Sequence, residues 1–418
     1  MTRQARGTLA VAGSAAAIFW PGAMIFGYPG VMAPHWQTVF GVGRAAIGNC
    51  LFFVLAALGV FMFLVGRWQE KAGTRVMITI GAALCGLAVP VAAYAGHLYL
   101  IYLWAFLTGT SSCFVYIPAL TTVQRWFPER RGLVSGMVNL TFGLSAAIMS
   151  PIFNGLLKAW GYVPMNLLVM AVALAVGLVA AQFTETPERA CFTDVGALPR
   201  PGSAPPRRKP GPSLTVAQTL RTASFWFLWL VWAMQGAAGI GMVTLSVMFG
   251  LSRGYSLEGA VLVLTAFNLT NGFSRIITGY VSDLVGRNIT MSLAFLAAGI
   301  AYFVLPFIWA LAGVALLAAV VGFAFGTLFA VSAPLATDCF GIRHFGAIFG
   351  LVFTAYGFVA GALGPSLGGY LADLTGSFVP VFAYLGAFCL ISGVFIHFVT
   401  PPLGEAVGVE QARRPASS

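Results

Sequence analysis

The sequence predicts an all-α membrane protein whose twelve transmembrane helices form two six-helix halves. Three observations support this fold class: the composition, the series of long apolar runs, and an internal repeat. Only 8% of the 418 residues are charged and 59% are hydrophobic, and the mean hydropathy is +0.90. Soluble domains carry about 25% charged residues and disordered chains are poor in large apolar residues. The composition therefore excludes both classes.

Each apolar run is long enough to cross a bilayer, whose core of about 30 Å takes roughly 20 residues of helix. The runs fall at 8–33, 45–66, 76–95, 98–122, 133–157, 164–184, 224–250, 258–281, 290–310, 312–337, 346–372 and 378–400. The first run follows Arg3 and Arg6, as in a signal peptide. Because it continues beyond Pro21 and many spans follow, we expect an uncleaved first helix.

The longest polar stretch, 185–223, separates the sixth run from the seventh and is rich in proline and arginine. Proline cannot continue a helix, so we expect a linker loop there. The predicted organisation is an N-terminal six-helix half at 1–184, a cytoplasmic linker at 185–223, a C-terminal six-helix half at 224–400 and a cytoplasmic tail at 401–418.

The positive charges predict the orientation in the membrane. With the N-terminus in the cytoplasm, 18 of the 22 Lys and Arg residues lie on the cytoplasmic side. Three (Arg44, Lys158 and Arg253) lie outside, and Arg275 lies within a span. Cytoplasmic loops collect Lys and Arg, so both termini are expected in the cytoplasm. The net charge of +11 thus reflects topology in a lipid bilayer and indicates no nucleic-acid partner.

An internal repeat relates the two halves. The loop 66–75 (GRWQEKAGTR) corresponds to the loop 279–287 (GYVSDLVGR), and their first glycines are 213 residues apart. Gly132 and Gly346 form a second pair, 214 residues apart. Two halves in the same order, with a site between them near the midplane, are a common plan among transporters.

The loop 279–287 resembles the G-x-x-x-D-x-x-G-R signature of the major facilitator superfamily. Its first copy is degenerate, with Glu70 and Lys71 around the usual aspartate position. Segments 125–132 (RWFPERRG) and 268–275 (NLTNGFSR) resemble the oxalate/formate antiporter and bacterial monocarboxylate transporter group. The resemblance implies the major facilitator fold, a bacterial inner membrane, and a conformational latch between the halves at Gly66, Gly73, Arg75, Gly279, Asp283, Gly286 and Arg287.

Arg275 is the first candidate for substrate binding. A buried arginine is costly in a membrane, no acidic residue occupies a span centre, and a guanidinium holds a carboxylate through two parallel hydrogen bonds. The alternative is a structural arginine at a helix end. Asn268 and Asn271 lie seven and four residues before Arg275, on the same helix face. They are candidates for binding the same anion or for packing between helices.

The resemblance also implies an aromatic cavity around the substrate. Tyr116 matches the tyrosine of the family's fourth helix, Phe325 and Phe329 match aromatic residues of the tenth, and Phe26 and Tyr28 are the nearest matches in the first. We expect Phe353 and Tyr356 to complete the wall, with packing in the core as the alternative for each phenylalanine. The antiporter has a second cation, a lysine, where this sequence has Val352, which favours a monocarboxylate because a buried charge needs a partner.

The predicted function is secondary transport of a small organic monocarboxylate of the lactate, pyruvate or formate class, by alternating access. Proton coupling and exchange are both open. The alternatives are a dicarboxylate or oxalate exchanger, an exporter of hydrophobic compounds and, from another class, a non-transporting membrane receptor. The sequence has no P-loop, HExxH or CxxC pattern, so we expect no ATP, metal, cofactor or enzymatic activity.

Overall fold

The structure is a computed structural model that describes residues 2–42, 44–190 and 213–402. Within these residues, twelve helices are long and apolar enough to cross a membrane, which confirms the predicted fold class. Most of the 185–223 linker and of the 401–418 tail lies outside the described residues. The division of the chain into domains at those boundaries stays a prediction.

The first six spans run from Arg3 to Ala181. The first of them has a π-helical turn, Ala23–Gly27, between α1 and α2, so it reaches seven residues beyond the predicted run. The helices are α1 (Arg3–Gly22), α2 (Tyr28–Phe40), α3 (Arg44–Ala72), α4 (Thr74–Ala93), α5 (Leu98–Trp126), α6 (Arg131–Trp160) and α7 (Tyr162–Ala181). Several extend past their apolar runs because polar helix ends leave the hydrocarbon region.

The other six spans follow the short helix α8 (Val216–Thr219). Span eleven is interrupted by two π-helical segments, Ala355–Ala360 and Ala362–Ser366, in its glycine-rich part. The helices are α9 (Ala223–Ser252), α10 (Leu257–Val285), α11 (Arg287–Val304), α12 (Leu311–Phe340), α13 (Phe345–Thr354), α14 (Leu367–Thr375) and α15 (Val379–Phe395). π-Helical turns are often found at functional sites.

The repeat is visible in the backbone. Gly73 and Gly286 are 213 residues apart, and each precedes the first residue of a helix. Their φ and ψ angles are 93° and 161° for Gly73, and 112° and 150° for Gly286. Because a side chain is strained at such positive φ values, both loops of the repeat need glycine to turn sharply into the next helix.

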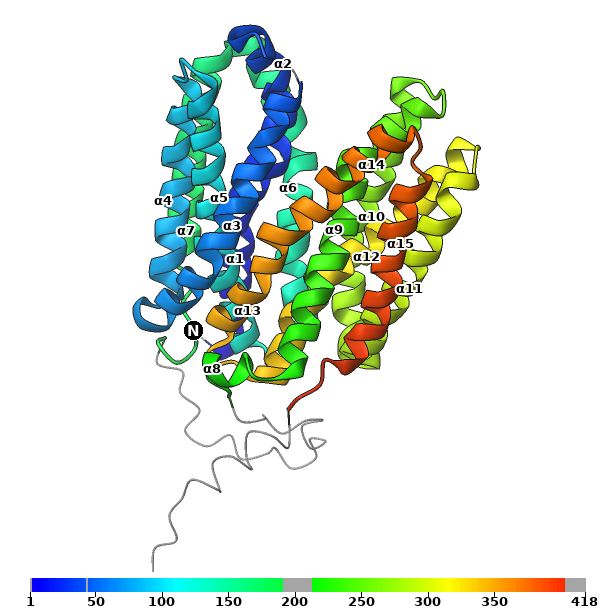
Figure 1. Cartoon of the computed structure of the whole chain (residues 1–418). Helices are drawn as coiled ribbons and strands as arrows, with labels where there is room; N and C mark the ends of the chain where they lie inside the picture. The colour runs from blue at the N-terminus through cyan, green and yellow to red at the C-terminus, as the bar shows by residue number, and fades with distance from the viewer. Residues whose placement is uncertain (1, 43, 191–212, 403–418) are drawn as a thin grey trace, which may run out of the picture.

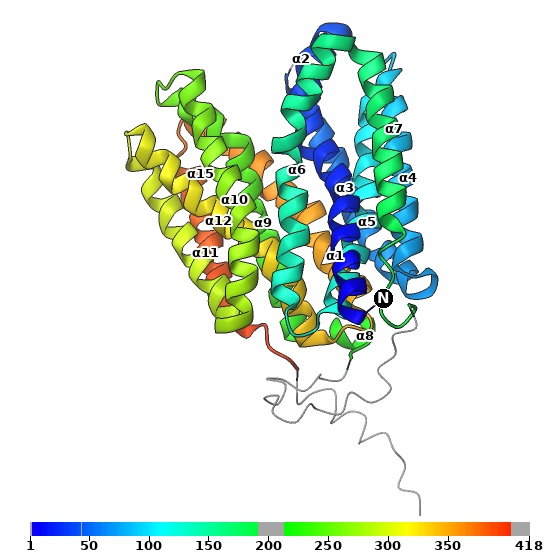
Figure 2. The same cartoon turned by 180° about the vertical axis from the view of Figure 1, so that it is seen from behind.

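The helices form two bundles, α1–α7 and α9–α15, which lean together at one end and spread apart toward the other (Figures 1 and 2). The N-terminus and α8 lie where the bundles meet, and we call this the linker end. Two sets of helices join the bundles: α3 packs against α13, and α6 packs against α10 and α12. These helices bring side chains of both bundles into one site.

Candidate functional site

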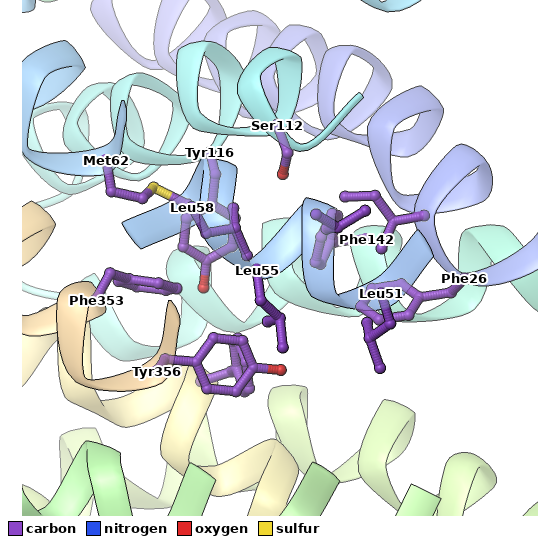
Figure 3. Close-up of a pocket in the computed structure, with 13 residues that line it drawn as sticks. Phe26, Leu51, Leu55, Leu58, Met62, Ser112, Tyr116, Phe142, Phe353 and Tyr356 are labelled. Atoms are coloured by element: carbon purple, nitrogen blue, oxygen red, sulfur yellow. The ribbon is translucent and has the colours of Figure 1, made fainter. Parts of the chain in front are cut away.

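A pocket lies between the two bundles, with an empty volume of about 410 Å³ including its opening. The side chains that form it share a mostly apolar character, and none is charged. They are Ile25, Phe26, Leu51, Val54, Leu55, Leu58, Met62, Ser112, Tyr116, Phe142, Phe329, Phe353 and Tyr356 (Figure 3).

One wall of the pocket comes from a single face of α3. Its five side chains are aliphatic or thioether groups at positions i, i+3, i+4, i+7 and i+11, which places them on one face of the helix. They are Leu51, Val54, Leu55, Leu58 and Met62. This row gives the pocket a continuous apolar surface on the side of the first bundle.

The opposite wall is aromatic and belongs to the second bundle. Phe329, Phe353 and Tyr356 line the pocket and surround the ring of Trp232 on α9, with centroid distances of 5.0, 4.5 and 5.8 Å. Trp232 is fully buried, so the three rings pack against one rigid support. Tyr116 closes the wall from the first bundle, 5.4 Å from Phe353.

Arg275 lies beside the pocket, behind the ring of Phe329, and is 2% exposed. Its Nη1 donates to the backbone carbonyl of Asn139 (2.8 Å), and its Nη2 donates to Oδ1 of Asn271 (3.2 Å). Its Cζ lies 5.0 Å from the ring centre of Phe329. Among the described residues no carboxylate pairs with this guanidinium, and its Nε has no hydrogen-bond partner. The site thus holds a buried cation without a counter-ion.

Helix α6 of the first bundle is shaped to receive Arg275. A Cβ at Gly143 would lie 3.2 Å from the Cζ of Arg275, and one at Gly136 would lie 2.3 Å from its carbonyl oxygen. Gly136, Asn139 and Gly143 share one face of α6, so the two glycines open space on either side of the asparagine. The side chain of Arg275 therefore crosses from the second bundle onto the first.

The structure brings most of the predicted substrate-binding residues together. Tyr116, Phe329, Phe353 and Tyr356 line the pocket, and Asn271 binds Arg275. Asn139 links Arg275 to Tyr116, because its carbonyl accepts from the guanidinium and its Oδ1 accepts from the Tyr116 hydroxyl. The cation thus lies close to the wall of the pocket.

Three predicted residues lie elsewhere. Asn268 is exposed on α10. Phe325 packs behind the pocket, against Phe329 and Phe267. Tyr28 points into the first bundle, where its hydroxyl donates to Oδ1 of Asn166. It lies two residues beyond Phe26, about 200° around the helix, and Phe26 is the residue that lines the pocket.

At the linker end, the second copy of the repeated loop binds the first bundle directly. The Asp283 carboxylate accepts hydrogen bonds from the backbone N–H groups of Gly132 (3.1 Å) and Leu133 (2.9 Å), at the beginning of α6. Arg287 pairs with Asp283 (2.5 Å) and with Asp338 (3.3 Å). A carboxylate is favoured at a helix N-terminus by unpaired N–H groups and by the helix dipole. Gly279 permits this contact, because a Cβ there would lie 2.5 Å from the Gly132 carbonyl oxygen.

The first copy of the loop makes a different contact. Glu70, which corresponds to Asp283 in the repeat, pairs with the ring of His344 just before α13 (3.0 Å). Gly66 lies against Gly346, whose carbonyl oxygen would be 2.0 Å from an added Cβ. The second copy therefore joins a carboxylate to a helix N-terminus, and the first joins a carboxylate to a histidine.

Gly73 and Arg75 do not join the bundles, contrary to the prediction. Gly73 packs on the guanidinium of Arg189. Arg75 binds Gln182 and Glu185, and all these residues follow or belong to the first bundle. The reason is that the chain turns at Gly73 and α4 then packs between α5 and α7, away from the second bundle.

Several site residues escaped the sequence analysis. They are the apolar row on α3, Phe142, Trp232 and, above all, Asn139, a fully buried asparagine within α6. A polar residue inside an apolar run is a signal that could have found Asn139. An aliphatic side chain on a membrane helix carries no such signal, since core, lipid and pocket positions have the same composition.

Comparisons with known proteins agree with this architecture. The chain matches the family model of the Major Facilitator Superfamily over residues 15–308 and 261–418. It is 26% identical to the oxalate:formate antiporter of Oxalobacter formigenes over 352 residues, 82% of this chain and 79% of that protein. It is 30% identical to human monocarboxylate transporter 11 over 361 residues, 83% of this chain and 72% of that protein.

Solved structures show the same fold. The fucose:proton symporter FucP of E. coli has a TM-score of 0.69 at 15% identity, with 96% of this chain and 100% of that chain covered. A structure of FucP in the outward conformation has a TM-score of 0.71 at 14% identity, with 94% and 99% covered. With twelve spans, a repeated signature loop and a family match along nearly the whole chain, this protein belongs to the major facilitator superfamily and is a multi-pass secondary transporter, not an enzyme.

Proposed function

We propose that this transporter carries a small organic monocarboxylate by alternating access, with the carboxylate held by Arg275. The observation that carries the proposal is the guanidinium of Arg275, buried beside the pocket without a carboxylate partner among the described residues. Such a charge is costly in a membrane, and an anionic substrate offsets that cost. Tyr116 and Tyr356 line the same pocket (Figure 3), where the Tyr356 hydroxyl can donate to the substrate, while the Tyr116 hydroxyl donates to Asn139.

The charges around the pocket favour one carboxylate over two. The thirteen lining residues contain no cation, so Arg275 is the single positive group next to the pocket in the described chain. Val352, where the resemblance places a second cation in the antiporter, is buried in α13 and does not line the pocket. A dicarboxylate would leave one charge unpaired.

The apolar row on α3 favours a substrate with a carbon chain. Once the carboxylate lies at Arg275, the rest of the molecule meets Leu55, Leu58 and their neighbours. Formate has no carbon chain to bury there. Among the predicted substrates, lactate, pyruvate and longer monocarboxylates therefore fit this pocket better.

We also propose a bacterial inner membrane with both termini, and so the linker end, in the cytoplasm. The distribution of Lys and Arg supports this orientation. The contacts of Asp283 and Glu70 then close the cytoplasmic side of the pocket. The carboxylates in the names of the oxalate:formate antiporter and of monocarboxylate transporter 11 support the substrate class.

The test is a competition series in proteoliposomes with radiolabelled butyrate as the probe. Unlabelled formate, acetate, propionate, butyrate and valerate should compete with increasing strength. Each buried methylene contributes about 0.8 kcal/mol, so inhibition constants should fall about fourfold per carbon until the pocket is full. Stronger competition by oxalate than by butyrate would favour the dicarboxylate exchanger. Uptake driven by a pH gradient would indicate proton symport, and uptake driven by preloaded butyrate would indicate exchange.

The apolar lining also favours a second candidate, an exporter of hydrophobic compounds. Butyramide separates the two, because it has the size of butyrate without the charge. For a carboxylate site, butyrate should compete at least tenfold more strongly than butyramide, as expected for a charged hydrogen-bonded pair. Equal competition by the two would contradict the carboxylate proposal and support the exporter.

A further inference from the structure

Asn139 connects the pocket to the contact between the bundles. Its Oδ1 accepts a hydrogen bond from the Tyr116 hydroxyl (2.8 Å), and Tyr116 lines the pocket. Its Nδ2 donates to the carbonyl of Ser135 on its own helix (2.9 Å) and to the carbonyl of Phe329 in the second bundle (3.3 Å). Its own carbonyl accepts from Arg275 (2.8 Å). One buried residue thus binds two groups of the opposite bundle and one pocket hydroxyl.

Asn166 shows what the same side chain does without such a connection. It is also fully buried, its Oδ1 accepts from the hydroxyl of Tyr28, and its Nδ2 donates to the carbonyl of Tyr162, four residues earlier. All of these groups belong to the first bundle. The two asparagines therefore share their burial and local hydrogen bonding and differ in the contacts of Asn139 with the second bundle.

We propose that Asn139 is a positioning residue that couples occupation of the pocket to separation of the bundles at the linker end. Its amide group holds Tyr116 toward the pocket and ties α6 to α12, while its carbonyl accepts from Nη1 of Arg275, a donor that a carboxylate on that edge of the guanidinium would use. The displacement of the Asn139 carbonyl by a substrate rests on the proposed function. The role of the Asn139 side chain in holding the bundles together in the empty protein is independent of that function.

The physical basis is competition for one guanidinium. A carboxylate brings a full opposite charge and can accept two parallel hydrogen bonds from the guanidinium, whereas the Asn139 carbonyl is neutral and accepts one. A carboxylate that binds the Nη1 edge of Arg275 therefore displaces the carbonyl of Asn139. That exchange removes a bond between α6 and α10 and leaves the longer bond from Asn139 to Phe329. Substrate binding thus weakens the contact between the two bundles beside the pocket. The contact of Asp283 with α6 at the linker end remains intact.

The experiment measures the separation of the bundles in the empty, full-length transporter. Spin labels at Glu129 and Ile289, exposed positions on the two bundles at the linker end, report the distance. Cys191→Ser removes one native cysteine, and the five cysteines of the described chain are buried. In Asn139→Ala, the separated population should rise about fivefold, the effect of one lost hydrogen bond. Asn166→Ala should change it by less than about twofold.

An unchanged distance in Asn139→Ala, or an equal shift in both variants, would overturn the proposal, since a general loss of stability affects both. If Asn139→Ala does not fold, Asn139→Ser replaces it, because its hydroxyl can bond within its own helix and is too short to reach Phe329. Saturating butyrate should raise the separated population further in both the unmodified protein and Asn139→Ala, because the substitution keeps the backbone carbonyl that Arg275 releases. If butyrate moves neither, the transport proposal fails, and the empty-protein result still decides the role of Asn139.

Discussion

Arg275→Gln is expected to lower carboxylate uptake at least thirtyfold. Glutamine retains a donor but loses the charge and the paired N–H groups that match a carboxylate. Removing one partner of a buried, hydrogen-bonded charge pair costs about 2–5 kcal/mol, and about 2 kcal/mol corresponds to thirtyfold. Arg275→Lys keeps the charge as a point donor and should retain part of the activity. Initial rates of butyrate uptake in proteoliposomes at several concentrations measure both effects.

Arg253→Gln is the matched control. Arg253 also belongs to the second bundle, donates to a backbone carbonyl (that of Pro306) and stacks on an aromatic ring, with its Cζ 4.2 Å from the centre of Trp309. It lies at the end of α9 away from the pocket. Wild-type uptake by Arg275→Gln would contradict the anion site. Equal losses in both variants would show that any removed arginine damages the protein, and thermal unfolding of each variant measures that damage directly.

Asp283→Asn is expected to open the linker end. Its carboxylate caps α6 through two N–H groups and pairs with Arg287. Asparagine offers one acceptor oxygen and no charge, so the variant loses one capping bond and the ion pair. With about 1 kcal/mol for the cap and a similar amount for the partly buried pair, the separated population should rise about thirtyfold. Distances between spin labels at Glu129 and Ile289 measure this population.

Asp373→Asn provides the control for Asp283. Asp373 is an exposed aspartate near the end of α14, at the opposite end of the molecule from the latch. Its substitution removes the same charge and should leave the distances unchanged. If Asp283→Asn also leaves them unchanged, the cap on α6 does not hold the bundles together, and the remaining contacts, among them the Arg131–Asp338 ion pair, are sufficient.

The sequence predicted the fold well because membrane helices must satisfy every backbone hydrogen bond within the span. Length and hydropathy then determine the number of spans, and the repeated loops relate the halves. The sequence predicted less well which side chains of a given helix face the pocket. Phe26 lines the pocket and Tyr28 does not, although they are two residues apart. The π-helical turn at Ala23–Gly27 contains Phe26 and ends just before Tyr28, so it changes the direction of both side chains around the helix, and hydropathy does not indicate it.

The two copies of the repeated loop are equivalent in sequence position but differ in the contacts that they make. Asp283 and Glu70 occupy equivalent positions, yet one caps a helix and the other pairs with His344. The sequence indicated that the first copy was degenerate. It could not indicate the partner, because His344 lies 274 residues from Glu70 and carries no motif of its own.

The sequence by itself determined that this chain spans a membrane twelve times, that its halves are related, and that Arg275 is a cation where lipid would penalise one. Those properties are local, since each depends on composition and spacing along the chain. The tertiary structure decided what surrounds that cation: the carbonyl of Asn139, the ring of Phe329 and the apolar row on α3. These groups come from spans far apart in the chain, and only the packing of two bundles against each other brings them to one pocket.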